Sequence, residues 1–345
     1  MNESSPYKYL PADFRSDQEV KWCPGCGDHA ILNSVLKALP EVAEELHYRH
    51  ERFTFVSGIG CSSRFPYYVN TYGFHGIHGR ATAIATGVKV ANPKLSVWQI
   101  SGDGDALAIG GNHFIHAIRR NIDINILLFN NEIYGLTKGQ YSPTSKLGKI
   151  TKTSPYGTIE HPFNPGEVVL GARGTFFARS IDVELALTQQ CLVAAAKHDG
   201  TSVVEILQNC VIFNDKTFGD FALSKELREE RTITLRHGER MIFGRNRDKG
   251  LVQIGMKLMV VTLGEGGVTE EDILIHNAHE PNPGIHMMLA NMSYPNYPVA
   301  LGVIRDVPDH TYDDNLRDQV EEVRAHGTYH NVDELLHSGD TWEVK

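Results

Sequence analysis

The 345-residue chain lacks several features that would each define a class of protein. No uninterrupted apolar run reaches the length needed to span a bilayer, and the first residues, MNESSPYKYLPADF, lack the basic head and apolar core of a signal peptide. Positive charge is not in excess, because 33 Lys and Arg residues face 42 Asp and Glu residues, a formal net charge of −9. We therefore expect no membrane partner, no nucleic-acid partner and a cytoplasmic location.

Cysteine is also scarce, and five cysteines in a compartment expected to be reducing do not predict a disulfide framework. Two of them form the motif Cys23-Pro-Gly-Cys26, just before an apolar pattern of helical spacing. Cys61 and Cys210 each follow an apolar segment typical of a strand. The motif alone fits a redox dithiol, half of a zinc site or half of an iron–sulfur site, and the four thiolates together also fit tetrahedral zinc. Cys191 lies in an apolar helical pattern and is interpreted as a small core residue.

Apolar segments typical of strands alternate with helical patterns through the first two thirds of the chain, and polar or Gly-rich loops follow the strands. This alternation predicts an α/β fold, a mostly parallel sheet with helices on both faces, whose ligands bind outside the carboxyl ends of the strands. The expected strands lie within 52–63, 95–105, 124–131 and 201–210, and the expected helices within 28–47, 79–91, 110–121 and 183–198.

The character of the sequence changes near residue 229. The surrounding stretch, KELREERTITLRHGERMIFGRNRDKGL, is highly charged, and the rest alternates short apolar pieces with loops that contain Pro and His. We therefore predict a domain over 1–228 that carries the binding site, and a C-terminal extension over 229–345 that serves as a cover or a subunit contact.

Two adjacent predicted strands end in oxygen-bearing side chains. The segment SGDGD places Asp103 after one strand, and INILLFNN ends the next strand with Asn131. A carboxylate and an amide oxygen at neighbouring strand ends suit Mg²⁺, which takes oxygen ligands and shares them with phosphates. Gly102 and Gly104 let the backbone approach a phosphate closely. Taken alone, each motif also fits a plain turn or a strand-end cap.

Gly-Asp-Gly followed at this distance by an apolar strand that ends in Asn-Asn resembles the cofactor-binding pattern of thiamine-diphosphate enzymes, in the half of the site that is distal to the pyrimidine. The resemblance implies a thiamine-diphosphate-binding fold. It further implies that Mg²⁺ is held by Asp103, by Asn131 and by the backbone carbonyl of Ile133, and that this ion ties the diphosphate to the sheet.

The cysteine motifs narrow this resemblance. The order CPGCG, IGCS, HGRA, GDGD with NN, and a late single cysteine, over residues 21–215, is similar to that of beta subunits of 2-oxoacid:ferredoxin oxidoreductases. The resemblance implies one [4Fe–4S] cluster bound by Cys23, Cys26, Cys61 and Cys210. It also implies a surface for thiamine diphosphate made of Ile59, Gly60, Cys61, Ser62, His78, Gly102, Gly104, Asp105, Gly135 and Leu136. Among these, His78 is the catalytic candidate, and a hydrogen-bonded loop histidine is the alternative.

By the same resemblance, the chain contributes to the CoA-dependent oxidative decarboxylation of 2-oxoglutarate to succinyl-CoA and CO2, or to the reverse reaction. Electrons would pass through the cluster to ferredoxin. No segment resembles the domain that carries the glutamate for the aminopyrimidine. We therefore expect an alpha subunit to supply this glutamate and the chain to be active only together with that subunit.

The loop YGLTKGQYSPTS, residues 134–145, bears on the choice of substrate. Lys138 lies two residues beyond Leu136, and an ammonium there would meet the distal carboxylate of 2-oxoglutarate. The loop resembles the 2-oxoglutarate members of the family more than the pyruvate members. A solvated loop lysine, and with it pyruvate or a broad range of 2-oxoacids, stays open. So do a non-redox thiamine enzyme subunit with a zinc site and a non-catalytic zinc-binding interaction protein.

Overall fold

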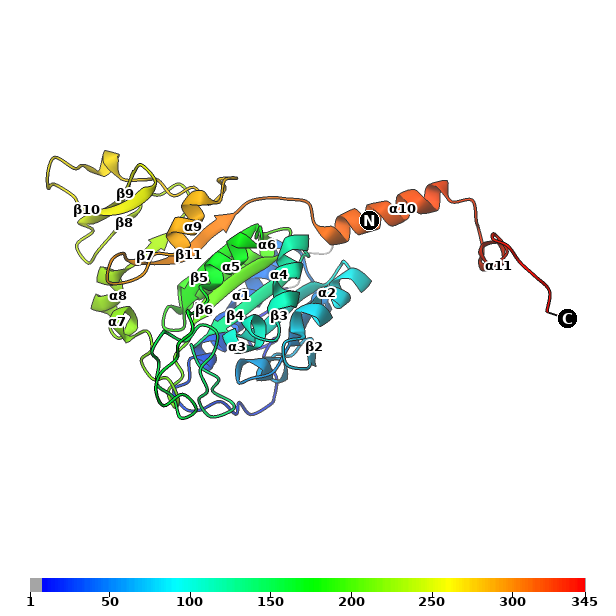
Figure 1. Ribbon diagram of the computed structural model, residues 1–345, viewed down its shortest axis with the longest axis horizontal. Helices are drawn as coiled ribbons and strands as arrows, with labels where there is room; N and C mark the ends of the chain where they lie inside the picture. The colour runs from blue at the N-terminus through cyan, green and yellow to red at the C-terminus, as the bar shows by residue number, and fades with distance from the viewer. Residues whose placement is uncertain (1–7, 345) are drawn as a thin grey trace.

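The computed structural model describes residues 8–344 and places an eight-stranded sheet at the centre of the molecule (Figure 1). The strand order is β2-β1-β3-β4-β6-β5-β11-β7, and neighbouring strands are parallel except β11, which runs antiparallel to β5. The predicted α/β fold with a mostly parallel sheet is thereby confirmed. The strands are β1 (Phe53–Ser57), β2 (Tyr72–His75), β3 (Ser96–Gly102), β4 (Asn125–Asn130), β5 (Phe176–Ile181), β6 (Ser202–Leu207), β7 (Thr232–Leu235) and β11 (Val299–Asp306).

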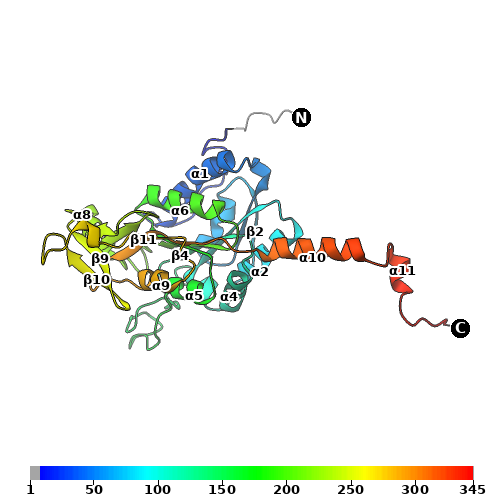
Figure 2. The same cartoon turned by 90° about the horizontal axis from the view of Figure 1, so that it is seen from above.

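Helices cover both faces of this sheet because its central strands bury side chains on both sides. In β4, Ile126 and Leu128 point into one core while Leu127 and Phe129 point into the other, as the two-residue period of a strand requires. Figure 2 shows the two helical layers on either side of the sheet. The core around Ile126 is closed by α2 (Ala81–Ala91), α4 (Gly111–Arg120), α5 (Pro165–Gly171) and α9 (Gly284–Ala290), and the other by α1 (Asp28–Glu45) and α6 (Leu185–Lys197).

Three elements of the fold are not indicated by the sequence patterns. The edge strand β2 has only four residues, which is too short for a clear period, and all four are exposed. The apolar run of β5 is interrupted by Arg179, which is buried there because it pairs with Glu205 of β6. The helix α3 (Asp103–Leu107) is too short to show a helical period.

Residues after 228 both complete the main sheet and form separate elements. β7 and β11, which follow residue 228, pair within the main sheet. The domain boundary at residue 228 stays a prediction. A small antiparallel sheet lies beyond β7, and α10 and α11 project at the opposite end of the molecule (Figure 1). The remaining helices and strands of the molecule are α7 (Gly219–Ala222), α8 (Lys225–Arg231), β8 (Ile242–Phe243), β9 (Lys249–Ile254), β10 (Lys257–Thr262), α10 (Tyr312–His326) and α11 (Val332–Leu336), and 3-10 turns span His50–Arg52, Ser62–Tyr67 and Glu270–Asp272.

Across residues 8–344, no helix combines the length and the apolar character needed to cross a bilayer.

Candidate active site

The predicted binding residues meet at the carboxyl edge of the sheet, where β1, β3 and β4 end. A cavity of about 540 Å³ opens there. Every residue predicted for thiamine diphosphate or Mg²⁺ lines this cavity, together with three residues that the sequence motifs do not single out, Tyr134, Thr137 and Gln140. Parallel strands bring their ends to one edge, which is why motifs tens of residues apart in the sequence converge.

Asp103 begins α3 at the end of β3 and is almost completely buried. Its Oδ2 accepts hydrogen bonds from the hydroxyls of Ser142 and Thr144, the latter at 2.6 Å. Burial raises the pKa of the Asp103 carboxyl to about 6, and the two hydroxyl hydrogen bonds oppose this rise. A cation beside Asp103 would favour the ionised carboxylate, so the position suits a metal ligand.

The turn after β4 presents two further oxygens. Glu132 adopts a left-handed conformation, with φ of 54°, and reverses the chain between Asn131 and Ile133. The Asn131 side chain donates to Gln208 Oε1 at 2.8 Å, and its own Oδ1 accepts from the Ile133 amide at 3.2 Å. The Ile133 carbonyl accepts no hydrogen bond from residues 8–344. Carboxylate, amide and free carbonyl oxygens on one cavity wall fit the oxygen preference of Mg²⁺.

Asp105 holds two loops of the cavity together. Its Oδ1 accepts from the backbone amides of Ile59 and Gly79, at 3.1 and 2.7 Å, and lies 2.8 Å from Nδ1 of His78. Its Oδ2 accepts from the Ser101 hydroxyl at 2.6 Å. Because Nδ1 of His78 is bound to this carboxylate, Nε2 is the ring nitrogen left for the cavity.

The close packing around Asp105 also explains a glycine in the SGIGC segment. A Cβ on Gly58 would lie 1.9 Å from Asp105 Oδ2, so a larger residue there would push the two loops apart.

Tyr134 supplies part of the cavity wall beside Gly104. Its hydroxyl donates to the Gly104 carbonyl at 3.0 Å, and a Cβ on Gly104 would lie 2.2 Å from its ring. Burial raises the pKa of the Tyr134 phenol to about 12, so the hydroxyl stays a neutral donor. The signal available in the sequence was its place between two predicted residues, Ile133 and Gly135.

The structure brings four cysteines together beside this cavity. A Cβ on Gly135, a cavity residue, would lie 3.5 Å from the Cys210 sulfur and 3.7 Å from the Cys61 sulfur. Burial, then the nearby Asp28, raises the pKa of the Cys61 thiol to about 12, and the thiols of Cys210 and Cys23 add to the rise. Burial also raises the pKa of the Cys26 thiol, with smaller contributions from Cys210 and Cys61.

The spacing of these thiols bears on what they can hold. Residues 8–344 contain no group of three His, Cys, Asp or Glu side chains placed to hold one metal ion. Four thiolates are the ligand set both of a [4Fe–4S] cluster and of a tetrahedral zinc ion. Cys191 is separate, buried in α6, as expected for a core residue.

Lys138 does not line the cavity of this chain. Its side chain is exposed, and its φ of 80° places the residue in a left-handed turn beyond Leu136. A smaller cavity of about 240 Å³ adjoins the main one and shares Ile59, Gly60 and Leu136 with it. Its other lining residues are Arg64, Tyr67 and His75. Arg64 is a second cation close to the main cavity, and no sequence motif singles it out.

Comparisons with known proteins bear on the fold and the family of the chain. A protein-family model, described as thiamine pyrophosphate enzyme, C-terminal TPP binding domain, matches residues 58–206 of this chain. A 2-oxoglutarate oxidoreductase subunit KorB of Mycobacterium tuberculosis is 52% identical over 335 residues, which cover 96% of this chain and 88% of that protein. Subunit beta of 2-oxoacid:ferredoxin oxidoreductase 1 of Aeropyrum pernix is 42% identical over 210 residues, which cover 61% of this chain and 65% of that protein.

A solved structure is similar over nearly the whole chain. It is a 2-oxoglutarate:ferredoxin oxidoreductase from Magnetococcus marinus with 2-oxoglutarate, coenzyme A and succinyl-CoA bound. The TM-score is 0.75 at 31% identity, covering 96% of this chain and 97% of that one. The fold and the matched model thus define a thiamine-diphosphate-binding domain. The chain belongs to the family of beta subunits of 2-oxoacid:ferredoxin oxidoreductases.

Proposed function

We propose that this chain, paired with an alpha subunit, catalyses the CoA-dependent conversion of 2-oxoglutarate to succinyl-CoA and CO2, or the reverse, with ferredoxin as the electron carrier. The observation that carries the proposal is that the cavity with Asp103 and Asn131 is also lined by Cys61, beside which the other three predicted cysteine ligands lie. The names of the relatives support 2-oxoglutarate as the substrate, because several of them are 2-oxoglutarate enzymes.

In this proposal, Asp103, Asn131 and the Ile133 carbonyl hold Mg²⁺, which in turn holds the diphosphate. Ser142 and Thr144 orient the Asp103 carboxylate, and Gln208 orients the Asn131 amide. Thiamine diphosphate, when bound, supplies the nucleophilic carbon and the electron sink for decarboxylation. The Asp103 carboxylate is buried, and its attraction to a bound ion would be stronger there than in water.

Cys23, Cys26, Cys61 and Cys210 would hold one [4Fe–4S] cluster as the electron outlet. Support comes from Gly135, which lines the cofactor cavity and also adjoins the sulfurs of Cys61 and Cys210. No bulky side chain separates the two sites at that point. A cluster placed there would receive electrons over a short path and pass them toward the exposed Cys23.

The cavity also explains why the chain would need a partner. Its two carboxylates, Asp103 and Asp105, are both engaged, the first by hydroxyls and the second by loop amides and His78. No glutamate is among the residues that line it in the part of the chain that the structure describes. We therefore assign the glutamate for the aminopyrimidine to the alpha subunit.

The distal carboxylate of the substrate would be bound by a cation at the rim, Lys138 or Arg64. Lys138 is exposed in the absence of a partner subunit, and Arg64 lines the adjoining cavity. Either cation would distinguish a dicarboxylate from pyruvate by a charge-assisted hydrogen bond.

The test is an activity assay of the chain purified anaerobically together with its alpha subunit. Viologen reduction should depend on CoA and run fastest with 2-oxoglutarate, compared with pyruvate and a branched 2-oxoacid. Equal rates with all three acids would replace the substrate assignment with a broad range. Full turnover by the isolated chain would contradict the shared active site.

A further inference from the structure

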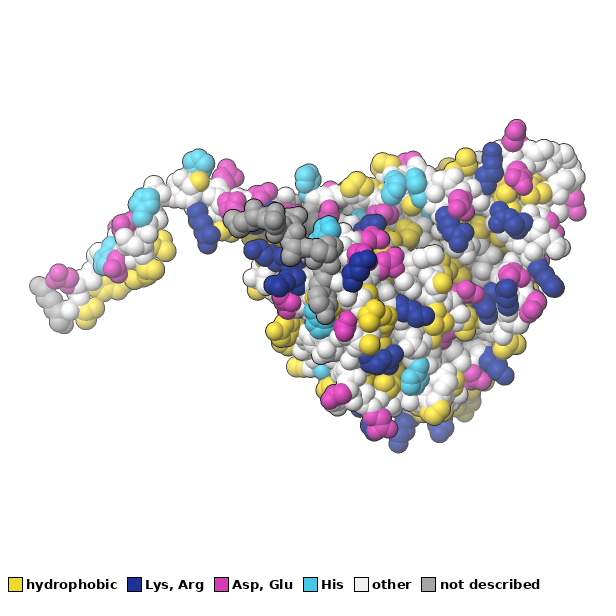
Figure 3. All heavy atoms as spheres, turned by 180° about the vertical axis from the view of Figure 1, so that it is seen from behind, with side chains coloured by type: hydrophobic (Ala, Val, Ile, Leu, Met, Phe, Trp, Pro, Cys, Tyr) yellow, Lys and Arg dark blue, Asp and Glu magenta, His cyan; other side chains and the backbone are white. Residues whose placement is uncertain are grey.

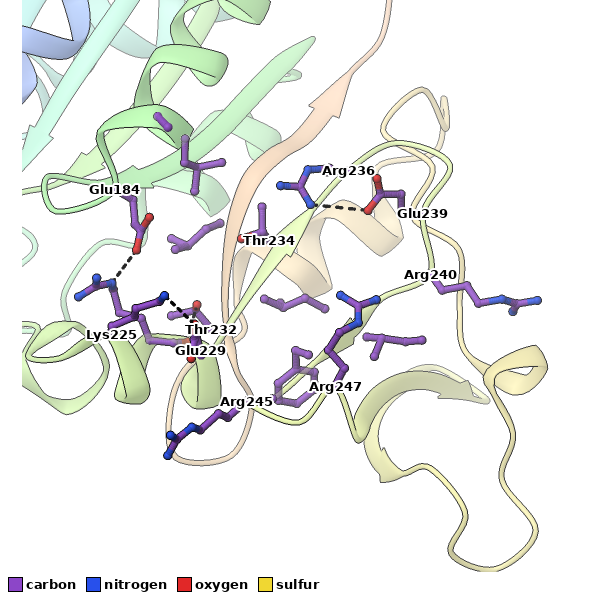
Figure 4. Close-up of a pocket in the computed structure, with 18 of the residues that line it drawn as sticks. Glu184, Lys225, Glu229, Thr232, Thr234, Arg236, Glu239, Arg240, Arg245 and Arg247 are labelled. Atoms are coloured by element: carbon purple, nitrogen blue, oxygen red, sulfur yellow. Dashed lines mark hydrogen bonds and ion pairs between the residues drawn. The ribbon is translucent and has the colours of Figure 1, made fainter.

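A second cavity, of about 560 Å³, lies far along the sheet from the cofactor site, between α6, α8, β7 and β8 (Figure 4). Six cationic side chains and three glutamates line it, although the chain as a whole carries a net charge of −9. We call it the basic groove; its cations are Lys225, Arg228, Arg236, Arg240, Arg245 and Arg247. Positive charge is thus concentrated at one place on an acidic protein.

Only part of this charge is neutralised within the chain. Arg228 pairs with Glu184 at 2.7 Å, whereas the Lys225–Glu229 and Arg236–Glu239 pairs are longer, at 3.6 and 3.7 Å. The guanidinium groups of Arg245 and Arg247 make no ion pair or hydrogen bond with residues 8–344 (Figure 4). Apolar side chains complete the lining, namely Leu187, Ile233, Ile242, Phe243 and Leu301. An occupant should therefore be acidic and partly apolar.

The C-terminal end of the chain has this character. Residues 314–344, which we call the acidic arm, contain eight carboxylates against two arginines. Apolar side chains of the arm are exposed, for example Val323 at 64%, Leu336 at 68% and Trp342 at 83%. Figure 3 shows hydrophobic side chains gathered along one side of the projecting arm.

The arm lacks the packing that normally stabilises such helices. α10 has 15 residues and α11 has 5, and helices of this length are marginal in water unless an apolar face is buried. Both helices project from the body (Figures 1 and 2). Their apolar side chains, such as Val323 and Leu336, are exposed. Gathered apolar side chains of this kind mark a surface that contacts a partner.

We propose that the acidic arm of one copy of this chain docks into the basic groove of a second copy. The arm is acidic and the groove is basic, and both present apolar side chains. The arm and the groove lie at opposite ends of the same chain (Figure 1). α10 alone spans about 22 Å, so the arm extends well away from its own groove. A two-fold arrangement places each arm in the other copy's groove and makes two equal contacts. The contact links two complete enzyme units and goes beyond the proposed function.

The first test measures self-association of the chain, purified with its alpha subunit, by analytical ultracentrifugation. Arg245→Glu with Arg247→Glu, and separately Glu321→Lys with Glu322→Lys, Asp333→Lys and Glu334→Lys, should each weaken association of the two units at least tenfold. Combining the groove and arm changes should restore part of it. Arg119→Glu with Arg120→Glu, on exposed positions of α4, is the matched control and should change nothing. Unaltered association in the groove and arm variants overturns the proposal.

The second test identifies the surface that the arm contacts. A photo-cross-linking residue at Trp342 is introduced into ¹⁵N-labelled chains, which are co-assembled with unlabelled chains. Cross-linked peptides that join a labelled arm to an unlabelled segment 225–247 support the proposal. Cross-links only within one copy, only to the alpha subunit, or to no part of the groove overturn it.

Discussion

The hydroxyl of Thr144 donates a hydrogen bond to the buried carboxylate of Asp103 at 2.6 Å. The same hydroxyl lies 3.0 Å from the amide oxygen of Asn130, whose nitrogen donates to Glu205 at 2.8 Å. Glu205 in turn pairs with Arg179 inside the sheet. The carboxylate proposed to hold Mg²⁺ is therefore fixed through a buried polar chain that crosses β3, β4, β6 and β5.

This relationship predicts that Thr144→Val will weaken Mg²⁺-dependent binding of thiamine diphosphate about ten- to hundredfold. The reason is the loss of a hydrogen bond to a charged group, worth about 1.5–3 kcal/mol. Thr158→Val is the control, because it makes the same chemical change at a buried threonine of the same loop, which donates to the Lys146 carbonyl and does not touch Asp103. If both variants bind the cofactor as the natural protein does, Thr144 does not position the carboxylate.

If Cys23, Cys26, Cys61 and Cys210 together hold one cubane, anaerobically purified protein should contain about four irons and four sulfides per chain. Replacing Cys23, Cys26, Cys61 or Cys210 with serine should abolish or cripple the cluster. Cys191→Ser, at a cysteine buried in α6, should leave iron and labile sulfide unchanged. Stoichiometric zinc without labile sulfide in the native protein would contradict the cluster assignment.

Lys138 and Arg64 lead to a prediction about the choice between 2-oxoglutarate and pyruvate. Lys138→Ala should cut kcat/KM for 2-oxoglutarate about ten- to hundredfold and spare any activity with pyruvate, because only the dicarboxylate has a distal charge to lose its partner. Arg64→Ala is measured beside it, since Arg64 lines the adjoining cavity whereas Lys138 is exposed. A selective loss at Arg64 alone moves the assignment there, and equal losses on both substrates in both variants refute a role in specificity.

His276 gives a prediction about pH and stability. Burial and, to a smaller extent, the nearby His286, His237 and His279 lower the pKa of His276 from 6.5 to about 4, and its hydrogen bond to the Val303 carbonyl opposes this shift. Between pH 4 and pH 6.5, the unfolded chain therefore binds a proton at His276 and the folded chain does not. The free energy of unfolding therefore has its full value above pH 6.5. Protonation of His276 in the unfolded chain lowers it by about 3 kcal/mol as the pH drops toward 4.

The check is the free energy of unfolding of the full chain in urea at several pH values. His276→Gln keeps a donor for the Val303 carbonyl and cannot titrate, so its stability should depend less on pH than that of the natural protein. Parallel pH profiles for the two proteins would show that His276 does not cause the loss.

The sequence contains the strand ends and their order, and these were enough to predict the cavity wall. Asp103 and Asn131 follow apolar strands, and parallel pairing of β3 and β4 forces the two residues to one edge. The family motifs then predicted the cysteines that the structure brings together. Confirmation extends to the fold and the family, while the roles of the individual residues stay predictions.

Other parts of the site depend on tertiary contacts without a local signal. Ser142 and Thr144 reach Asp103 because a long irregular segment after β4 folds back over the strand end. Lys138 lies in a left-handed turn, is exposed and does not line the cavity of this chain, and none of this follows from its distance from Leu136 in the sequence. A buried arginine such as Arg179 looks like a break in a strand until its partner on β6 is known.

The most direct test of the central claim is the affinity of the cofactor-stripped complex for thiamine diphosphate, measured by isothermal titration calorimetry with and without Mg²⁺. The natural protein should bind tightly only with Mg²⁺. Asp103→Ala and Asn131→Ala should bind at least a hundredfold more weakly while keeping the fold, because the diphosphate loses the ion that ties it to the sheet. Tight binding by both variants, or binding that ignores Mg²⁺, would contradict the account.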